Sequence, residues 1–432
     1  MGAPGTGKTI LAEGIAFQNA TKKSPVLYLT TLSEPLEKFI LHGQQYGFFD
    51  PDKVGESVFY EDLARMILEE GGVENLANIV GDLLLKYKPG LLFIDSFKAL
   101  NELFSDQSTR RLMVFELASA LSAYSCTSFL VGEYAQETTT TLPEFAIADV
   151  VLNLMKYSTN VREQRFLKVE KLRGSDSIPG MHAFAITADG IVMYPRLLTP
   201  KVAPDYAPKI ERVNTGITGL DEMVEEGFWR GSTTLIAGPS GAGKTILALS
   251  FIREGALQGE AGLYLGFQEN PNQLARVMQN LGWNGLELLE GGLFELMYRS
   301  PVEMQLDTVA ADLFSRVLNG KVRRVVIDAL GDLERCSIDT QRFTDFIYAL
   351  MQWFAVENVT CMMTHEIHEL FDVHSISGQQ ISNMSDNLVL LGLTNDNEMN
   401  RTIRIVKTRG SAHANRRHEL EITNKGVFVK KS

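Results

Sequence analysis

Gly238-Pro239-Ser240-Gly241-Ala242-Gly243-Lys244-Thr245 decides the fold, because the same pattern, Gly2-Ala3-Pro4-Gly5-Thr6-Gly7-Lys8-Thr9, opens the chain. Both stretches match G-x-x-x-x-G-K-[ST]. In such a loop the backbone N–H groups surround a chain of phosphates, the lysine reaches the outer phosphates and the hydroxyl meets Mg²⁺. The sequence therefore predicts two nucleotide sites, formed by Gly2, Gly5, Gly7, Lys8 and Thr9 and by Gly238, Gly241, Gly243, Lys244 and Thr245.

The composition is that of a globular protein with two domains. The chain has 432 residues, more than one ordinary core holds, with 45% hydrophobic and 22% charged residues. No apolar run approaches the ~18 residues of a membrane-spanning helix, so we expect a cytoplasmic protein that does not enter membranes. The net charge of −12 argues against a surface that binds nucleic acid.

The chain is a tandem duplication. Lys8 and Lys244 are 236 residues apart (244 − 8), and so are Lys171 and Lys407 (407 − 171). Four prolines between residues 195 and 208 indicate an extended linker between the copies. We therefore predict a first domain at 1–203 and a second at 204–432.

Each copy alternates apolar strands with helices, which predicts a mostly parallel sheet flanked by helices and closed by a C-terminal hairpin. The fold class is thus α/β with two tandem phosphate-loop domains. Leu91–Asp95 and Val325–Asp328 are apolar runs that end in aspartate, typical of a central strand that ends at the site. We expect Asp95 and Asp328 to hold Mg²⁺ through water, together with Thr9 and Thr245.

The two copies differ before their phosphate loops. The second has residues 210–237 there, including a predicted strand at 232–237, whereas the first copy begins at the loop. A phosphate loop needs the strand that leads into it. We therefore expect the natural chain to be longer at its N-terminus than the sequence given.

Hydrolysis also needs a carboxylate that orients or deprotonates the attacking water. Glu269 follows the strand Leu263–Leu265 and is the candidate in the second copy. Alignment without gaps sets Ser33, and not Glu34, opposite Glu269. Either the loop shifts by one residue and Glu34 serves, or the first site binds ATP and hydrolyses it poorly.

A third repeated element supplies cations. Lys171 and Arg173 lie two residues apart on a predicted strand, as do Lys407 and Arg409, so each pair projects to one side. Such pairs, distant in sequence from their own phosphate loop, suit a cationic finger that reaches the γ-phosphate of a neighbouring subunit.

These features together resemble the KaiC family of double-domain RecA-type ATPases. The resemblance rests on the paired phosphate loops, the Ile-Asp strand ends, the K-x-R-G strands and Gly216-Ile217-x-Gly219-Leu220-Asp221, and it covers essentially the whole chain. It implies two RecA-like P-loop NTPase domains in a ring, normally a hexamer of stacked double rings. ATP would lie between subunits, and the Lys171/Arg173 and Lys407/Arg409 fingers would act in trans.

The resemblance also implies autophosphorylation in the second domain. Residues 374–383 are similar to the family's phosphorylated stretch, with Ser382 at the serine position and Asn383 in place of the adjacent threonine. The family's paired glutamates become Gln268-Glu269. Ser382 is therefore the candidate phosphoacceptor, in a signalling switch whose protein partner is unknown.

The function predicted is Mg²⁺-dependent hydrolysis of ATP to ADP and phosphate in a ring oligomer, with serine autokinase activity. One alternative is a DNA-dependent recombinase or helicase motor of the RecA/RadA type. It would need a basic, aromatic loop after the aspartate strand, whereas residues 330–339 contain one basic residue, Arg335. The other alternative is an ATP-sensing scaffold without turnover, which Ser33 and Gln268 favour.

Overall fold

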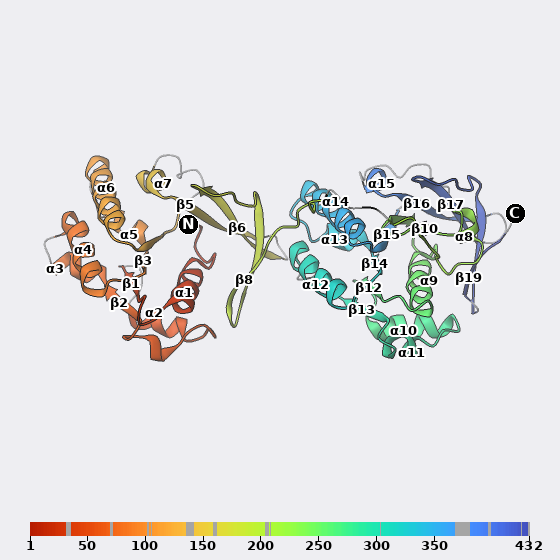
Figure 1. Cartoon of the computed structure of the whole chain (residues 1–432), viewed down its shortest axis with the longest axis horizontal. Coiled ribbons are helices and arrows are strands. Elements are labelled where there is room, and N and C mark those ends of the chain that lie inside the picture. Colours follow the sequence, from red (N-terminus) through yellow and green to blue (C-terminus); the bar gives the residue numbers. More distant parts are fainter. Residues whose placement is uncertain are drawn as a thin grey trace. The chain divides into compact units, whose positions relative to one another are not determined.

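The computed structural model describes all residues except 32–35, 70–71, 102, 105, 135–141, 159–161, 204–206, 208, 303, 368–380, 396–398, 425 and 431–432. The chain folds into two compact units, Met1–Arg196 and Leu197–Ser432, which are described separately (Figure 1). The sequence placed the boundary between residues 203 and 204, in the linker that follows Arg196. No helix in the described part of the chain is long and apolar enough to cross a bilayer.

The second unit is built on one nine-stranded sheet with the order β13-β12-β14-β15-β11-β16-β17-β18-β19. Pairing is parallel from β13 to β16 and antiparallel from β16 to β19. The predicted α/β fold with a parallel sheet and a closing hairpin is confirmed. The larger strands are β11 (Thr233–Gly238), β12 (Gly262–Gly266), β13 (Phe294–Tyr298), β14 (Arg324–Asp328), β15 (Thr360–Glu366), β16 (Asn387–Asn395), β17 (Met399–Thr408), β18 (His418–Thr423) and β19 (Gly426–Val429), and a short pair is formed by β9 (Arg212–Val213) and β10 (Phe228–Trp229).

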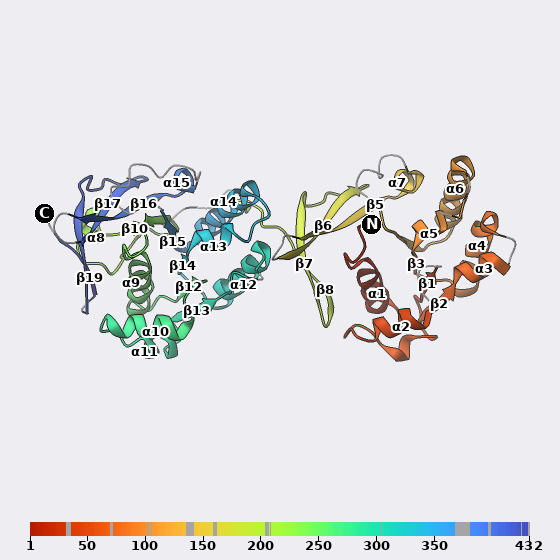
Figure 2. The ribbon, with the colours of Figure 1, turned by 180° about the vertical axis from the view of Figure 1, so that it is seen from behind.

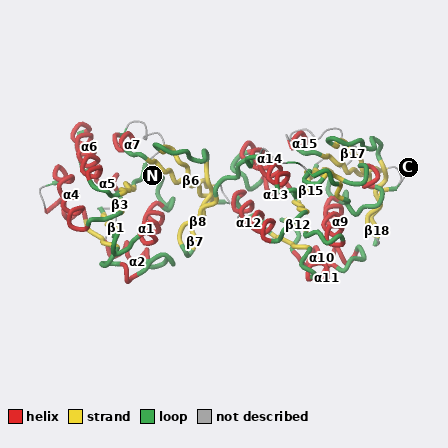
Figure 3. Tube along the Cα trace, in the orientation of Figure 1, coloured by secondary structure: helices red, strands yellow, loops and turns green. Residues whose placement is uncertain are grey.

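Helices cover both faces of this sheet, which explains why its central strands are apolar throughout. Val325 and Ile327 of β14 pack into the core under α12, α13 and α14, whereas Val326 faces the core under α9 and α10 (Figures 1 and 3). The helices are α8 (Leu220–Met223), α9 (Lys244–Leu257), α10 (Pro271–Asn280), α11 (Gly285–Glu290), α12 (Leu306–Asn319), α13 (Leu330–Glu334), α14 (Thr340–Val356) and α15 (Ile381–Met384).

The first unit divides its larger strands between two separate sheets. One is parallel, with the order β2-β1-β3-β4, and the other is antiparallel, with the order β5-β6-β7-β8. The strands are β1 (Val26–Thr30), β2 (Val58–Asp62), β3 (Leu91–Asp95), β4 (Thr127–Val131), β5 (Val150–Ser158), β6 (Glu163–Leu172), β7 (Met181–Thr187) and β8 (Gly190–Tyr194).

The start of the chain lies along β5. The Leu154 N–H donates to the Met1 carbonyl at 2.9 Å, the Met1 amino group donates to the Leu152 carbonyl at 2.7 Å, and Gly2 forms a parallel bridge with Leu154. In the second unit β11 holds the matching place beside β16 and joins both halves of the sheet. The first unit has no such joining strand among its described residues.

Helix α1 packs on one face of β1 and β3, while α3, α4 and α6 cover the other face (Figure 2). Tyr28 and Phe93 face α1, whereas Leu27 and Ile94 face the other helices. The helices are α1 (Lys8–Asn19), α2 (Leu36–Gly43), α3 (Leu63–Glu69), α4 (Leu76–Tyr87), α5 (Phe97–Asn101), α6 (Gln107–Ala123) and α7 (Pro143–Ile147), with single 3₁₀ turns at Pro51–Lys53 and Val73–Asn75.

Candidate nucleotide site

In the second unit the phosphate loop joins the end of β11, at Gly238, to the start of α9, at Lys244. The first N–H groups of a helix have no partner inside the helix, and the helix dipole places positive charge there. Helix α9 spans 14 residues. The junction therefore presents a long helix N-terminus to anionic groups such as phosphates.

Two of the motif glycines are needed for a conformational and a steric reason at once. Gly243 has φ 101°, and a Cβ there would lie 2.8 Å from Cδ1 of Ile422. Gly7 has φ 96°, and a Cβ there would lie 3.0 Å from Cδ1 of Ile186. A side chain at either position would strain the backbone and crowd an isoleucine of the closing hairpin. The hairpin of each unit thus packs directly behind the phosphate loop.

The loop lysines fold back onto their own loops. Nζ of Lys244 donates to the Gly238 and Pro239 carbonyls, both at 2.9 Å. Nζ of Lys8 donates to the Ala3 carbonyl at 2.8 Å. Burial lowers the pKa of Lys244, and the nearby Glu366 and Asp328 carboxylates oppose this shift. Each lysine is therefore held at the loop, where an anion would meet it.

Asp328 is fixed at the end of β14 by hydroxyl groups from three other segments. Thr245 donates to its Oδ2 at 2.7 Å, Tyr264 donates to the same oxygen at 2.5 Å, and Thr364 donates to Oδ1. Asp328 is 7% exposed. Donors on both oxygens stabilise a carboxylate in a buried place.

The first unit repeats this arrangement. Thr9 and Tyr28 each donate to Oδ2 of Asp95 at 2.9 Å, and burial raises the pKa of Asp95. A threonine hydroxyl beside a carboxylate is the oxygen donor set that Mg²⁺ prefers, with waters and phosphates completing its shell. The residues at both loops therefore fit Mg²⁺.

The two tyrosines were not recognised as site residues from the sequence. Their signal was already available, because Tyr28 and Tyr264 are 236 residues apart (264 − 28), in register with the loop lysines. A tyrosine hydroxyl at the same position of two repeated buried strands indicates that it has an equivalent hydrogen-bond partner in each copy. The partners are Asp95 for Tyr28 and Asp328 for Tyr264.

Glu269 follows β12, next in the sheet to β14, and is partly buried. The preceding turn is tied to the aspartate strand, because the Phe267 N–H donates to the Asp328 carbonyl at 3.3 Å. Burial raises the pKa of Glu269, and the charges of Asp328 and Asp332 raise it further. A carboxyl with a raised pKa at the edge of a nucleotide site has the properties of a general base.

The first unit follows the same path up to Thr31, whose N–H donates to the Asp95 carbonyl at 3.1 Å. Glu34 and Ser33 come next and lie outside the described residues. The two alternatives for the base of the first site therefore both stay open.

The finger residues contact short helices of their own unit. Nζ of Lys407 donates to the carbonyls of Ser382, Asn383 and Ser385, and Arg409 donates to the Asn383 carbonyl at 2.7 Å. The hydrogen bonds found for Lys407 and Arg409 within the described residues do not reach the phosphate loop.

The first unit shows the same contacts with α7. Lys171 donates to the Phe145 and Ala146 carbonyls at 3.0 and 3.1 Å, and Arg173 donates to the Ala146 carbonyl at 3.0 Å. The side chain of Arg173 is 57% exposed and that of Arg409 is 55% exposed. The arginines are therefore accessible from outside their own unit.

Ser382 lies in α15 and is partly buried. Most of the stretch that resembles the family's phosphorylated segment, residues 374–380, lies outside the described residues. The described end of this stretch contacts Lys407, whose Nζ donates to the Ser382 carbonyl oxygen at 3.2 Å. The candidate phosphoacceptor and the candidate finger are thus neighbours within one unit.

Sequence reasoning missed two further acids. Glu366 is the last residue of β15, and its charge acts on Lys244. In the first unit Oε1 of Glu133 lies 3.4 Å from Nζ of Lys8. The spacing of these two acids is 233 (366 − 133), the same as that of Asp95 and Asp328 (328 − 95). This matched spacing was a usable signal.

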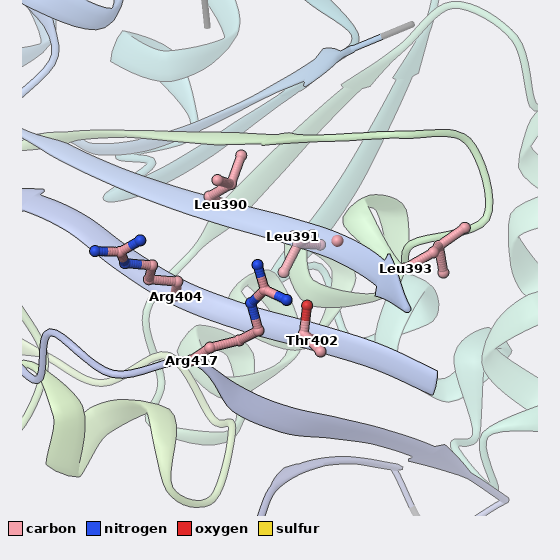
Figure 4. A pocket seen from close by; sticks show the side chains of 7 residues that line it. Leu390, Leu391, Leu393, Thr402, Arg404 and Arg417 are labelled. Carbon is pink, nitrogen blue, oxygen red and sulfur yellow. The ribbon is translucent and has the colours of Figure 1, made fainter. Parts of the chain in front are cut away.

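A separate small cleft lies over β16 and β17 of the second unit (Figure 4). It is lined by residues 390–393 of β16, by Thr402 and Arg404 of β17, and by Arg417. The side chains of Thr402, Arg404 and Arg417 lie on the same side of these strands (Figure 4). None of the sequence-predicted site residues lines this cleft.

Comparison with known proteins agrees with this geometry. The family model for the KaiC ATPase matches residues 1–197 and again residues 213–432. The chain is 28% identical over 446 residues to the circadian clock oscillator protein KaiC of Rippkaea orientalis, a match that covers 100% of this chain and 84% of the relative.

Two other clock proteins match over similar lengths. The circadian clock oscillator protein KaiC 1 of Synechocystis is 28% identical over 455 residues, and KaiC of Synechococcus elongatus is 25% identical over 442 residues. Each match covers 100% of this chain and 84% of the relative. The chain therefore belongs to the KaiC family of ATPases, with one match to the family domain in each unit.

Proposed function

We propose that this chain binds Mg²⁺–ATP at both phosphate loops and hydrolyses it to ADP and phosphate, with the second loop as the more active site. The observation that carries the proposal is the common sheet edge at the ends of β12 and β14. There burial and the charge of Asp328 raise the pKa of Glu269, and Asp328 accepts a hydrogen bond from Thr245. A base and an oxygen donor set therefore converge where the phosphate loop ends.

The roles follow from this arrangement. Lys244 and the N-terminus of α9 would bind the outer phosphates, while Thr245 and Asp328 would hold Mg²⁺. The bound ion would supply charge neutralisation for the phosphate oxygens. Glu269 would orient the attacking water and take its proton. The partly desolvated position of Glu269 favours the protonated product of that transfer.

The trans arrangement is the next part of the proposal. Arg173 and Arg409 are more than half exposed, and their contacts lie at α7 and α15. Subunits of a ring, six by family resemblance, would bring these residues to a neighbour's γ-phosphate. An arginine supplied in trans stabilises the charge of the transition state and accelerates phosphoryl transfer by about 10³-fold or more.

We also propose that Ser382 accepts a phosphoryl group and acts as a slow signalling switch for a protein partner. The support is its sequence context and its contact with Lys407. A phosphate on Ser382 would add negative charge next to two cationic side chains, Lys407 and Arg409, which would favour the modified state.

One experiment tests these points together. Purified full-length protein is incubated with Mg²⁺–ATP, phosphate release is measured, phosphosites are mapped by mass spectrometry, and assembly is followed by native mass spectrometry. We expect phosphate release that the Lys244→Ala change lowers by about 100-fold, phosphate on Ser382, and a hexamer. Binding of ATP without any release would instead favour the scaffold, and stimulation by single-stranded DNA would favour a motor.

A further inference from the structure

Asp332 is a buried carboxylate next to the candidate site that the roles above do not use. It lies on α13, directly after the strand that ends in Asp328, and is 2% exposed. Helix α13 is anchored by Leu330 and Leu333, both fully buried in the core. The aspartate is therefore held on a rigid support and not on a loose loop.

Two side chains satisfy this carboxylate. Nε2 of Gln268 donates to Oδ2 at 3.1 Å, and Nη1 of Arg335 donates to Oδ1 at 3.1 Å. The side chain of Arg335 is 68% exposed, so solvent weakens that ion pair. An ionised carboxylate is costly to bury unless its oxygens are bonded. The Gln268 contact therefore matters for Asp332, whose carboxylate is the buried partner of the pair.

The contact constrains the candidate base indirectly, because Gln268 directly precedes Glu269 in the chain. The backbone of this turn is already tied to Asp328 through the Phe267 N–H. The hydrogen bond to Asp332 adds a side-chain anchor from a different element. The two anchors restrict the movement of the turn, and a base must be placed within hydrogen-bond reach of its water.

The pair is specific to the second unit. Alignment from Asp95 and Asp328 sets Ala99 opposite Asp332, so the first unit has no acid there. The residue before the base is a glutamine in this chain, where the family resemblance implies a second glutamate. Position 268, after β12, thus carries no carboxylate. The carboxylate of Asp332, on α13, lies within hydrogen-bond distance of the side chain at that position.

We propose that Gln268 and Asp332 form a positioning pair that orients Glu269 and supplies the site's second carboxylate from α13. Asp332 acts through Gln268 and through its charge, and it does not touch the substrate. A negative charge beside Glu269 disfavours the ionised base relative to its protonated form, which strengthens the base. The inference rests on the proposed hydrolysis at the second site.

The pair predicts compensation between two substitutions. Gln268→Glu alone would place a second carboxylate within hydrogen-bond distance of Asp332, and the repulsion should lower kcat about tenfold with little change in KM. Asp332→Ala alone should lower kcat by a similar factor. The double variant, which moves the carboxylate from α13 to the strand end, should recover most of the wild-type kcat.

Asp332→Asn covers the case in which the alanine variant does not fold, because it keeps the shape and removes the charge. The matched control is Asp307→Asn, which changes another buried aspartate, paired with Arg342 on α14. The control should lower the melting temperature without changing kcat. If the fold-decrease in kcat of the double variant equalled the product of the decreases in the two single variants, the two residues would act independently and the pairing would be overturned.

A second readout does not depend on turnover. Amide hydrogen exchange in the peptide spanning residues 266–270 should become faster in Asp332→Ala, which removes the acceptor for Gln268, and stay unchanged in Asp307→Asn. Equal exchange in wild type and these two variants would reject the pair even if hydrolysis were absent. Absence of phosphate release by the wild-type protein would reject the proposed function separately. The Lys244→Ala variant shows how much of the release comes from the second site.

Discussion

The hydroxyl of Thr245 lies 2.7 Å from Oδ2 of Asp328, a hydrogen bond between the first turn of α9 and the end of β14. The two residues are 83 positions apart in the chain. The same bond recurs in the first unit at 2.9 Å, between Thr9 and Asp95. Both units thus hold a threonine hydroxyl and an aspartate carboxylate side by side at the start of the helix that follows the phosphate loop.

The two phosphate loops should contribute unequally to turnover. We expect Lys244→Ala to lower the rate of phosphate release by about 100-fold, the order seen when one transition-state donor is removed. Lys8→Ala should leave most of the release in place, because the alignment without gaps sets Ser33, which carries no carboxylate, opposite Glu269. Steady-state phosphate release measures both, with circular dichroism as the folding control. Equal losses would contradict the proposed asymmetry.

The pH dependence of turnover should report Glu269. A base must be ionised to work, so activity is present above its pKa and falls as the pH drops through that value. Burial and the charges of Asp328 and Asp332 raise the pKa of Glu269, so the acidic limb should lie above the range of an ordinary glutamate.

The check is kcat measured from neutral pH downward in wild type and in Glu269→Gln. The variant should bind ATP, lose about 10²-fold or more in kcat and lack this limb. If kcat of the variant fell at the same pH as kcat of the wild type, the acidic limb would belong to a group other than Glu269.

Arg409 should act on a neighbour's nucleotide. Lys244→Ala and Arg409→Ala should each be nearly inactive at the second site. Mixed after subunit exchange, they create interfaces in which an intact phosphate loop meets an intact arginine, so activity should reappear. Phosphate release of the mixture, against each variant alone, is the measurement. No recovery, with exchange shown by native mass spectrometry, would place the arginine in cis or outside the reaction.

Stability should depend on Arg324, at the start of β14, whose side chain is fully buried. It pairs with Glu260 at 2.7 Å and donates to the Asn214 and Phe251 carbonyls. Removing one partner of a buried ion pair leaves the other charge uncompensated and costs about 3–5 kcal/mol. Arg324→Ala should lower the free energy of unfolding by this amount in denaturant titration.

The neighbouring Arg323 offers the control for that measurement, because its side chain is exposed and donates to the Glu357 carbonyl at 3.1 Å. Arg323→Ala should change the free energy of unfolding by less than about 1 kcal/mol. Equal losses of unfolding free energy in the two variants would show that the buried contacts of Arg324 do not contribute more to stability than an exposed arginine does.

Local sequence determined the phosphate loops, the duplication and the α/β class. Glycine spacing specifies a loop that only a few backbone conformations allow, and Leu91–Asp95 was predicted with the bounds that the strand has. Such features depend on neighbours in the chain, where residue type controls backbone conformation directly. The sequence also placed Asp328 at a strand end, and the structure ends β14 at that residue.

Tertiary structure decided which side chains meet. Tyr264 and Thr364 converge on Asp328 from different strands, and Gln268 meets Asp332 across 64 positions. These contacts depend on the order of strands in the sheet, which no local spacing specifies. The antiparallel pairing of β16 with β17 and of β17 with β18, and the separate sheets of the first unit, were missed for the same reason. Pairing of distant strands is set by packing of the whole unit and not by the residues of one segment.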